Sequence, residues 1–270
     1  MIGQRKLKEQ LNNIRLLEEL PKSIIITGEK GMGKHEFANL IANKFLMQYE
    51  KIDYELSLDI LNDMYNLSVI KFYMIDFDEL MNNKRLERFE NTLLKFIEEP
   101  PELAWIVILA EDVDLILETI RNRCQIFKLA PYSINELSQI ADMNDRELDA
   151  ETLSLLRTPG LIVSGVTKVQ IEALTNLSMS IISNISKSTP ANTLTLANLF
   201  IGENKQYDLD LFLTVFCRML VTRYLQSNCD QKYFNAFTVT KDLQKDLKIM
   251  NVNEKNLLER YLLRLKNELQ

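Results

Sequence analysis

A glycine-rich segment between two apolar runs carries the clearest chemistry in the sequence. Residues 28–35 read Gly-Glu-Lys-Gly-Met-Gly-Lys-His, and they lie between a β-branched run at 23–27 and a helical pattern at 37–45. Glycines at this spacing let backbone N–H groups turn toward phosphate oxygens, and the N-terminus of the next helix adds positive potential. The segment therefore predicts a phosphate-binding loop. Its expected nucleotide contacts are Gly28, Gly31, Gly33 and Lys34.

Two positions that nucleotide hydrolysis requires hold other residue types. A Ser or Thr hydroxyl for Mg²⁺ is expected directly after Lys34, and this chain has His35, its single histidine. Because Mg²⁺ prefers hard oxygen ligands, imidazole is a poor substitute. An apolar run at 69–75 ends at Asp76, which is suitably placed for a carboxylate near the metal. The next position, where an acid that activates water is expected, is Phe77.

These departures leave three interpretations of the loop open. It is a vestigial turn, a site that binds nucleotide without hydrolysis, or an ATPase site with a shifted base, Asp78 or Glu79. We favour the vestigial turn, so ATP is a possible cofactor that is not favoured. Asp78 and Glu79 lie one and two residues too far along to replace the missing acid, and we expect them to point elsewhere, at the start of a helix.

Strand and helix patterns alternate through the first half of the chain. Alternation of this kind predicts an α/β domain with a mostly parallel sheet and helices on both faces. The expected strands are residues 23–27, 69–75, 105–109 and 125–129. The expected helices are residues 4–20, 37–45, 86–97 and 115–120. Pro100 and Pro101 end the third of these helices, because proline lacks an N–H donor and restricts the residue before it.

The strand pattern disappears after Pro131, and three parts follow from this change. We predict an α/β domain over 1–131, a small helical lid over 132–170 and an all-α C-terminal domain over 171–270. Within the lid, Thr158-Pro159-Gly160 is expected to interrupt the helices. The expected breaks in the C-terminal domain are residues 188–190, 202–204 and 227–230.

Composition and charge exclude several classes of protein. No run approaches the ~20 apolar residues of a membrane span, and no apolar signal-peptide core follows Met1. We therefore expect a cytoplasmic protein with no membrane partner. Three cysteines, far apart and without paired spacing, argue against a disulfide framework and a zinc site. A net charge of −6 is not that of a dedicated nucleic-acid domain, so any DNA contact would come from a local patch.

Two motifs resemble one known family. Residues 91–101, Asn-Thr-Leu-Leu-Lys-Phe-Ile-Glu-Glu-Pro-Pro, closely resemble the NALLKxLEEPP segment of the AAA+ subunits of bacterial clamp loaders. Residues 120–125, Ile-Arg-Asn-Arg-Cys-Gln, resemble the SRC motif of the same family, and Ile2-Gly3-Gln4 fits its opening. The resemblance covers residues 1–131. It implies a AAA+ domain followed by a lid and by a helical collar that packs with partner subunits.

Within that family, the departures resemble the delta-prime branch, which does not hydrolyse ATP. A nucleotide-sensing Arg is expected just after Pro159-Gly160, and Leu161 stands there. The cysteine-rich zinc module that usually follows the phosphate loop is absent, so no zinc is expected. The resemblance implies a subunit without intrinsic ATPase activity, in a complex with DNA-directed DNA polymerase activity. Its implied partners are the gamma/tau ATPase and delta subunits, and indirectly the sliding clamp and primed DNA.

The resemblance also assigns a role to Arg123. In the family, this arginine reaches the γ-phosphate bound by the neighbouring subunit, an effect worth ~10³–10⁵ in rate in well-studied NTPases. Cys124 beside it is expected to be a buried structural thiol. A helix near the central chamber offers possible phosphate contacts, at Arg85, Arg88 and Lys95. A solvated helix face is the alternative for those three residues, and a stand-alone nucleotide-responsive protein is the alternative for the whole chain.

Overall fold

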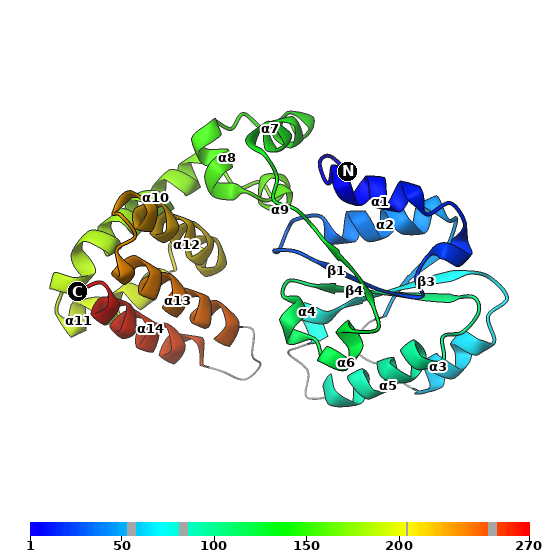
Figure 1. Ribbon diagram of the computed structural model, residues 1–270. Coiled ribbons are helices and arrows are strands. Elements are labelled where there is room, and N and C mark those ends of the chain that lie inside the picture. The colour runs from blue at the N-terminus through cyan, green and yellow to red at the C-terminus, as the bar shows by residue number, and fades with distance from the viewer. Residues whose placement is uncertain (53–57, 81–85, 204, 248–252) are drawn as a thin grey trace. The chain divides into compact units, whose positions relative to one another are not determined.

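Five parallel strands form one sheet in the order β2-β3-β4-β1-β5 (Figure 1). The strands are β1 (Ser23–Thr27), β2 (Gln48–Lys51), β3 (Lys71–Asp76), β4 (Ala104–Ala110) and β5 (Gln125–Lys128). The predicted parallel sheet is confirmed, and four of its strands lie where the sequence places them. β2 was not predicted, because all four of its side chains are exposed and its sequence has no apolar run.

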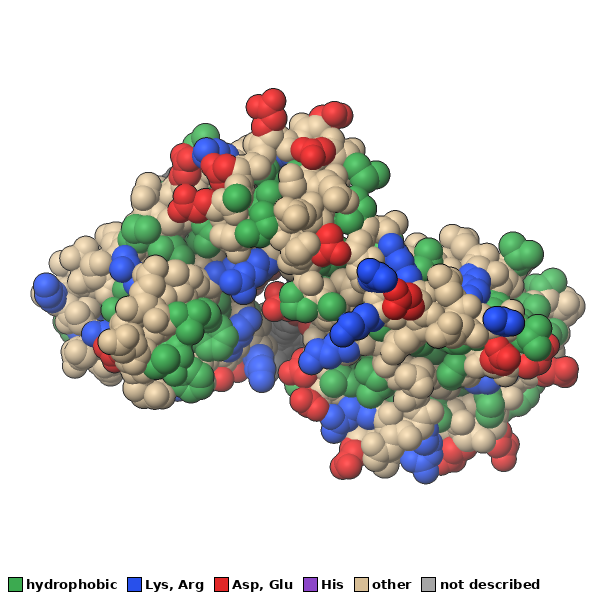
Figure 2. Space-filling view, turned by 45° about the horizontal axis from the view of Figure 1, so that its top comes forward, with side chains coloured by type: hydrophobic (Ala, Val, Ile, Leu, Met, Phe, Trp, Pro, Cys, Tyr) green, Lys and Arg blue, Asp and Glu red, His purple; other side chains and the backbone are tan. Residues whose placement is uncertain are grey.

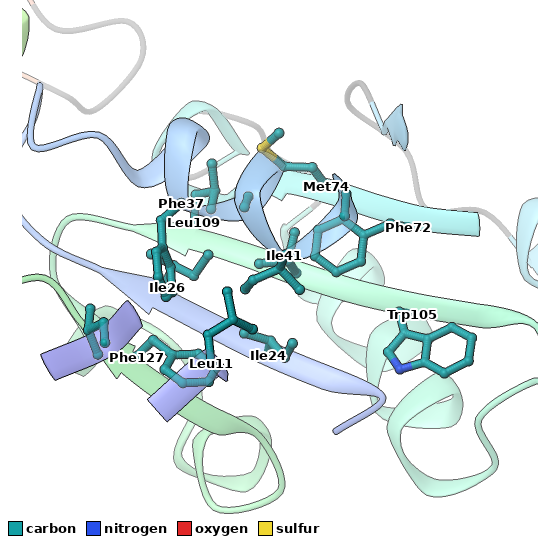
Figure 3. Close-up of a cluster of buried hydrophobic side chains, with 14 of the residues drawn as sticks. Leu11, Ile24, Ile26, Phe37, Ile41, Phe72, Met74, Trp105, Leu109 and Phe127 are labelled. Carbon is teal, nitrogen blue, oxygen red and sulfur yellow. The ribbon is translucent and has the colours of Figure 1, made fainter. Parts of the chain in front are cut away.

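The sheet is buried on both faces, which explains the unbroken apolar run in β1. Ile24 and Ile26 belong to a cluster of buried side chains that includes Phe37 and Ile41 of α2 (Lys34–Lys44) (Figure 3). Ile25 belongs to a second cluster, on the opposite face. A strand covered on both faces favours apolar residues on both sides, as at Ile24–Ile26, so the alternation typical of a half-exposed strand is missing.

Helices cover the two faces of the sheet (Figure 1). On one face lie α1 (Arg5–Asn13) and α2, and on the other lie α3 (Leu58–Tyr65), α5 (Leu86–Glu98) and α6 (Glu118–Arg121). A single turn, α4 (Phe77–Leu80), follows β3 without a connecting loop. α5 ends two residues before Pro100, in agreement with the prediction.

Three short helices follow the sheet: α7 (Ile134–Met143), α8 (Ala150–Leu156) and α9 (Pro159–Val163). The side chain of Ser133 accepts a hydrogen bond from the backbone of Glu136 at the start of α7, a capping box. The predicted interruption at Thr158-Pro159-Gly160 is shorter and lies slightly earlier: the helices break at Arg157 and Thr158, and Pro159 and Gly160 already belong to α9. Pro159 is the first residue of α9, a position where the fixed φ of proline suits a helix and its missing N–H costs nothing.

The rest of the chain is helical, as predicted. Its helices are α10 (Lys168–Asn184), α11 (Pro190–Thr195), α12 (Leu209–Gln226), α13 (Gln231–Asp246) and α14 (Glu254–Glu268). The expected break at 227–230 separates α12 from α13, and the one at 188–190 ends where Pro190 begins α11. The break at 202–204 precedes α12, and its residue 204 lies outside the described residues. The apolar stripe of α12 is core, because Phe212, Phe216 and Leu220 are fully buried. None of the helices within the described residues is long and apolar enough to span a membrane.

The structure describes residues 1–52, 58–80, 86–203, 205–247 and 253–270, and these form two units. The first holds Met1–Leu153 and Arg157–Ser164, so the sheet and α9 belong to it together. The second holds Ser154–Leu156 and Gly165–Gln270. The three-part division at 131/132 and 170/171 stays a prediction, and α10 runs across the second of these positions.

Candidate functional site

The phosphate-loop segment joins β1 to α2 at the carboxyl edge of the sheet, the edge where open α/β sheets bind ligands. Gly31 and Gly33 both have positive φ angles, +81° and +89°. Backbone of this kind favours glycine, which explains why the turn uses it. The strand, glycine loop and helix that the sequence predicts are therefore in place.

Lys34 is turned back into its own loop. Its Nζ donates a hydrogen bond to the carbonyl oxygen of Gly28 at 2.8 Å, and only 8% of the residue is exposed. The carboxylate of Asp78 lies 3.9 Å from the same Nζ. A lysine in this arrangement has its charge compensated within the chain, so contact with a phosphate would require it to leave Gly28.

The carboxylate of Asp76 binds backbone N–H groups of its own chain. Its Oδ1 accepts hydrogen bonds from the backbone N–H groups of Asp78 and Glu79, at 3.1 and 3.3 Å, which cap α4. Its Oδ2 lies 3.8 Å from Nε2 of His35. The position expected to hold a magnesium-binding hydroxyl thus places an imidazole against the carboxylate. This donor set does not fit a hard cation that selects oxygen ligands.

The expectation for Asp78 is wrong. Its carboxylate does not point elsewhere: both of its oxygens accept the single backbone N–H of Glu111, at 2.8 and 3.1 Å, on the side that faces Lys34. The turn of α4, which begins directly after β3, brings the side chain back to the sheet edge. Glu79 does point away, because it pairs with Lys51 at 2.9 Å.

Phe77 occupies the position of the missing acid, and it is buried. Its ring belongs to the apolar cluster that also contains Ile75 and Ile108. The side chain therefore contributes packing at a position where hydrolysis would need a proton acceptor.

Arg123 lies between α6 and β5, and about half of its side chain, 47%, is exposed. Its Nη1 donates to the carbonyl oxygen of Thr119 at 2.9 Å, and its Nη2 lies 3.9 Å from a carboxylate oxygen of Glu98. The two contacts leave much of the guanidinium facing solvent. A planar group with five donors in this position can bind an anion presented by another molecule.

Cys124, next to Arg123, is partly buried and belongs to the edge of the core cluster. Burial raises the pKa of this thiol to about 12. The sulfur is therefore protonated near neutral pH and is not a reactive thiolate, which agrees with a structural role.

The predicted DNA-contact residues are only partly described. Lys95 is an exposed residue of α5. Arg88 belongs to the same helix, but its side chain lies outside the described residues, as does all of Arg85. Lys and Arg side chains of the α/β unit stand beside Asp and Glu side chains in the view of Figure 2. The DNA contact stays a prediction.

Sequence reasoning missed the residues that contact the loop from outside. The hydroxyl of Tyr132 donates to the carbonyl oxygen of Met32 at 3.0 Å. The backbone N–H of Gly160 donates to the carbonyl oxygen of Gly31 at 2.7 Å. The Thr-Pro pair before Gly160, which is typical of a helix start, was the available signal for the position of α9. Nothing in the sequence indicates that α9 meets the loop.

Known proteins match parts of this chain. A family model described as "DNA polymerase III, delta subunit" matches residues 47–133, which include the residues 91–101 and Arg123. DNA polymerase III subunit gamma of Buchnera aphidicola subsp. Schizaphis graminum is 26% identical over 193 residues, covering 58% of this chain and 52% of that protein. DNA polymerase III subunit delta' of Escherichia coli is 34% identical over 74 residues, covering 26% of this chain and 22% of that protein.

Solved structures with a similar fold include the RuvB Holliday junction branch migration motor of Thermotoga maritima. It superposes with a TM-score of 0.53 at 17% identity, over 82% of this chain and 88% of that one, which shows a shared fold only. The chain spans about half the length of the gamma subunits it matches. The chain has a parallel α/β fold with a helical C-terminal region, as predicted, and it shares this fold with the RuvB motor. Its predicted likeness to the clamp-loader subunits of DNA polymerase III is confirmed.

Proposed function

We propose that this chain is a delta-prime-like clamp-loader subunit that does not hydrolyse ATP itself. It assembles with gamma/tau-type ATPase subunits and a delta-type subunit, and the complex loads a sliding clamp on primed DNA. Its own chemical contribution is the guanidinium of Arg123, offered to nucleotide bound by a neighbouring subunit. The chain needs neither ATP nor zinc of its own.

One contrast within the α/β unit supports this proposal. The lysine of the phosphate loop is buried and bound to Gly28, whereas Arg123 extends into solvent. A hydrolytic subunit needs a free loop lysine and an acid after β3, and this chain has a compensated Lys34 and a buried Phe77 in these places. A subunit that assists a neighbour needs only the exposed arginine.

The direct test of this role is Arg123→Ala in a complex reconstituted with the gamma- and delta-type subunits of the same cell. We expect assembly to be unchanged and the ATPase activity stimulated by clamp and DNA to fall by about 10²-fold or more, because the guanidinium stabilises charge on the transferred phosphoryl group. Arg123→Lys should also be deficient, since an ammonium lacks the planar fork.

Lys128→Ala is the matched control for charge, because Lys128 is an exposed cation on the adjacent strand, β5. It should leave the stimulated ATPase activity at the wild-type level. Stimulated activity that survives Arg123→Ala in an assembled complex would refute the role in trans.

A second candidate function rests on the position of Asp78. A carboxylate 3.9 Å from the loop lysine is where a shifted base of an active ATPase would be found. That carboxylate already accepts the backbone N–H of Glu111 with both oxygens, which stabilises its charged form and weakens it as a base. Mg²⁺-dependent turnover by the isolated chain that is lost in Asp78→Asn would favour this candidate over the first.

A further inference from the structure

The carbonyl oxygens of the phosphate loop accept hydrogen bonds from donors elsewhere in the chain and from the loop's own lysine. Gly160 N–H binds the carbonyl oxygen of Gly31, the Tyr132 hydroxyl binds that of Met32, and Lys34 Nζ binds that of Gly28. Two of these donors, Tyr132 and Gly160, come from the segment after the sheet, 100 and 129 residues beyond the loop residues that they contact. The segment after the sheet therefore contacts the α/β core at the phosphate loop.

The contact between the loop and α9 is closer than side chains allow. A Cβ added to Gly160 would lie 2.5 Å from Cα of Gly31, and one added to Gly31 would lie 3.1 Å from Cα of Gly160. Real Cβ atoms essentially never come within 3.0 Å of another heavy atom, and here both partners are backbone, which cannot move aside alone. The contact therefore requires glycine at position 160, and at position 31 the positive φ of +81° strains any other residue type.

We propose that the phosphate loop is the docking site of the chain's own helix α9, and that this Gly31–Gly160 contact holds α7 and α9 on the α/β core without nucleotide. The backbone hydrogen bond of 2.7 Å orients α9 on the loop, and the two glycines allow the two backbones to lie close together. The hydroxyl of Tyr132 adds a second attachment from the start of the same segment. The proposal goes beyond the clamp-loader role and does not depend on it.

Thr158 lies beside the Gly31–Gly160 contact but adds no hydrogen bond to it. This residue is 3% exposed, and its hydroxyl oxygen has no hydrogen-bond partner among the described residues. It lies 3.2 Å from the position of a Cβ on Gly31, so it faces the loop. A buried hydroxyl without a partner costs stability, and an apolar group of the same shape removes that cost. Thr158→Val should therefore leave the contact intact.

The test compares Gly160→Ala with Thr158→Val in the full chain, by thermal unfolding and by amide hydrogen exchange. Helix propensity alone predicts that alanine near the start of α9 is stabilising. The close contact predicts the opposite: Gly160→Ala lowers the Tm by several degrees, and exchange at residues 28–34 and 159–163 becomes faster by about tenfold or more. Thr158→Val keeps the wild-type exchange and an equal or higher Tm.

A Gly160→Ala protein with a raised Tm and wild-type exchange would overturn the proposal. If that variant does not fold, Tyr132→Phe gives the answer, because it removes one hydroxyl only and should still speed exchange at residues 28–34. Wild-type exchange in Tyr132→Phe would then count against the proposal. Millimolar Mg-ATP should leave exchange of the wild-type chain unchanged, and a large change at residues 159–163 would show a nucleotide-dependent joint instead. These readouts are independent of clamp-loader assembly.

Discussion

The ammonium group of Lys34 is bound inside the chain, and this has a consequence for stability. Lys34→Met removes its hydrogen bond to the Gly28 carbonyl and should lower the free energy of unfolding by about 1–3 kcal/mol. Calorimetry should detect no Mg-ATP binding in either protein, because the wild-type lysine is already compensated. Micromolar binding of Mg-ATP to the wild type that is lost in Lys34→Met would favour an active ATPase subunit over the proposed non-hydrolysing subunit.

Cys124 provides a pH dependence at the same scale. Burial raises its pKa from 9.0 to about 12, so between these values the unfolded chain loses the proton while the folded chain keeps it. The unfolded state then binds fewer protons, and the stability contributed by this thiol falls as pH rises through that window. Urea unfolding at pH 8 to 11 should show a smaller decline for Cys124→Ala than for the wild type. Parallel declines would contradict the raised pKa.

At the scale of the element, α4 depends on one capping side chain. Asp76→Ala removes the acceptor for the N–H groups of Asp78 and Glu79 and should lower the free energy of unfolding by about 0.5–2 kcal/mol. Asp76→Asn is the matched control, because asparagine caps helices nearly as well. If both variants are equally destabilised, the capping account of Asp76 is wrong and the lost charge opposite His35 is the better explanation.

The central strands of the sheet were predictable because buried strands are rich in apolar residues. Residues 24–26 and 105–109 are buried on both faces, and unbroken apolar runs are typical of such strands. β2 could not be found in this way, because an exposed edge strand carries no such run. The turn of Asp78 toward Lys34 was also beyond reach, since it depends on a helix that starts without a loop after β3.

The parts of the site that are made by distant segments were the least predictable. Local spacing indicates a glycine loop, but the partner of Gly31 is Gly160, and no pattern in the sequence links the two. Arg123 was identified by resemblance alone. Its residue type does not distinguish an arginine that acts on a neighbour from an ordinary surface arginine, and its exposure agrees with both.

For the whole molecule, the proposed function requires an assembly with other subunits. Its likeness to DNA polymerase III subunits covers part of its length, and the role proposed for Arg123 requires a neighbouring subunit that binds nucleotide. A stand-alone nucleotide-responsive protein would instead respond to ATP by itself. The two functions therefore differ first in the proteins that bind the chain in its native cell.

The most direct measurement is affinity purification of the tagged full chain from its native cell, with quantitative mass spectrometry of the proteins that accompany it. The account predicts gamma/tau- and delta-type subunits in near-stoichiometric amounts, and the same recovery with Arg123→Ala, because that substitution affects chemistry and not assembly. Recovery of the chain without either type of subunit would contradict its assignment to a clamp loader.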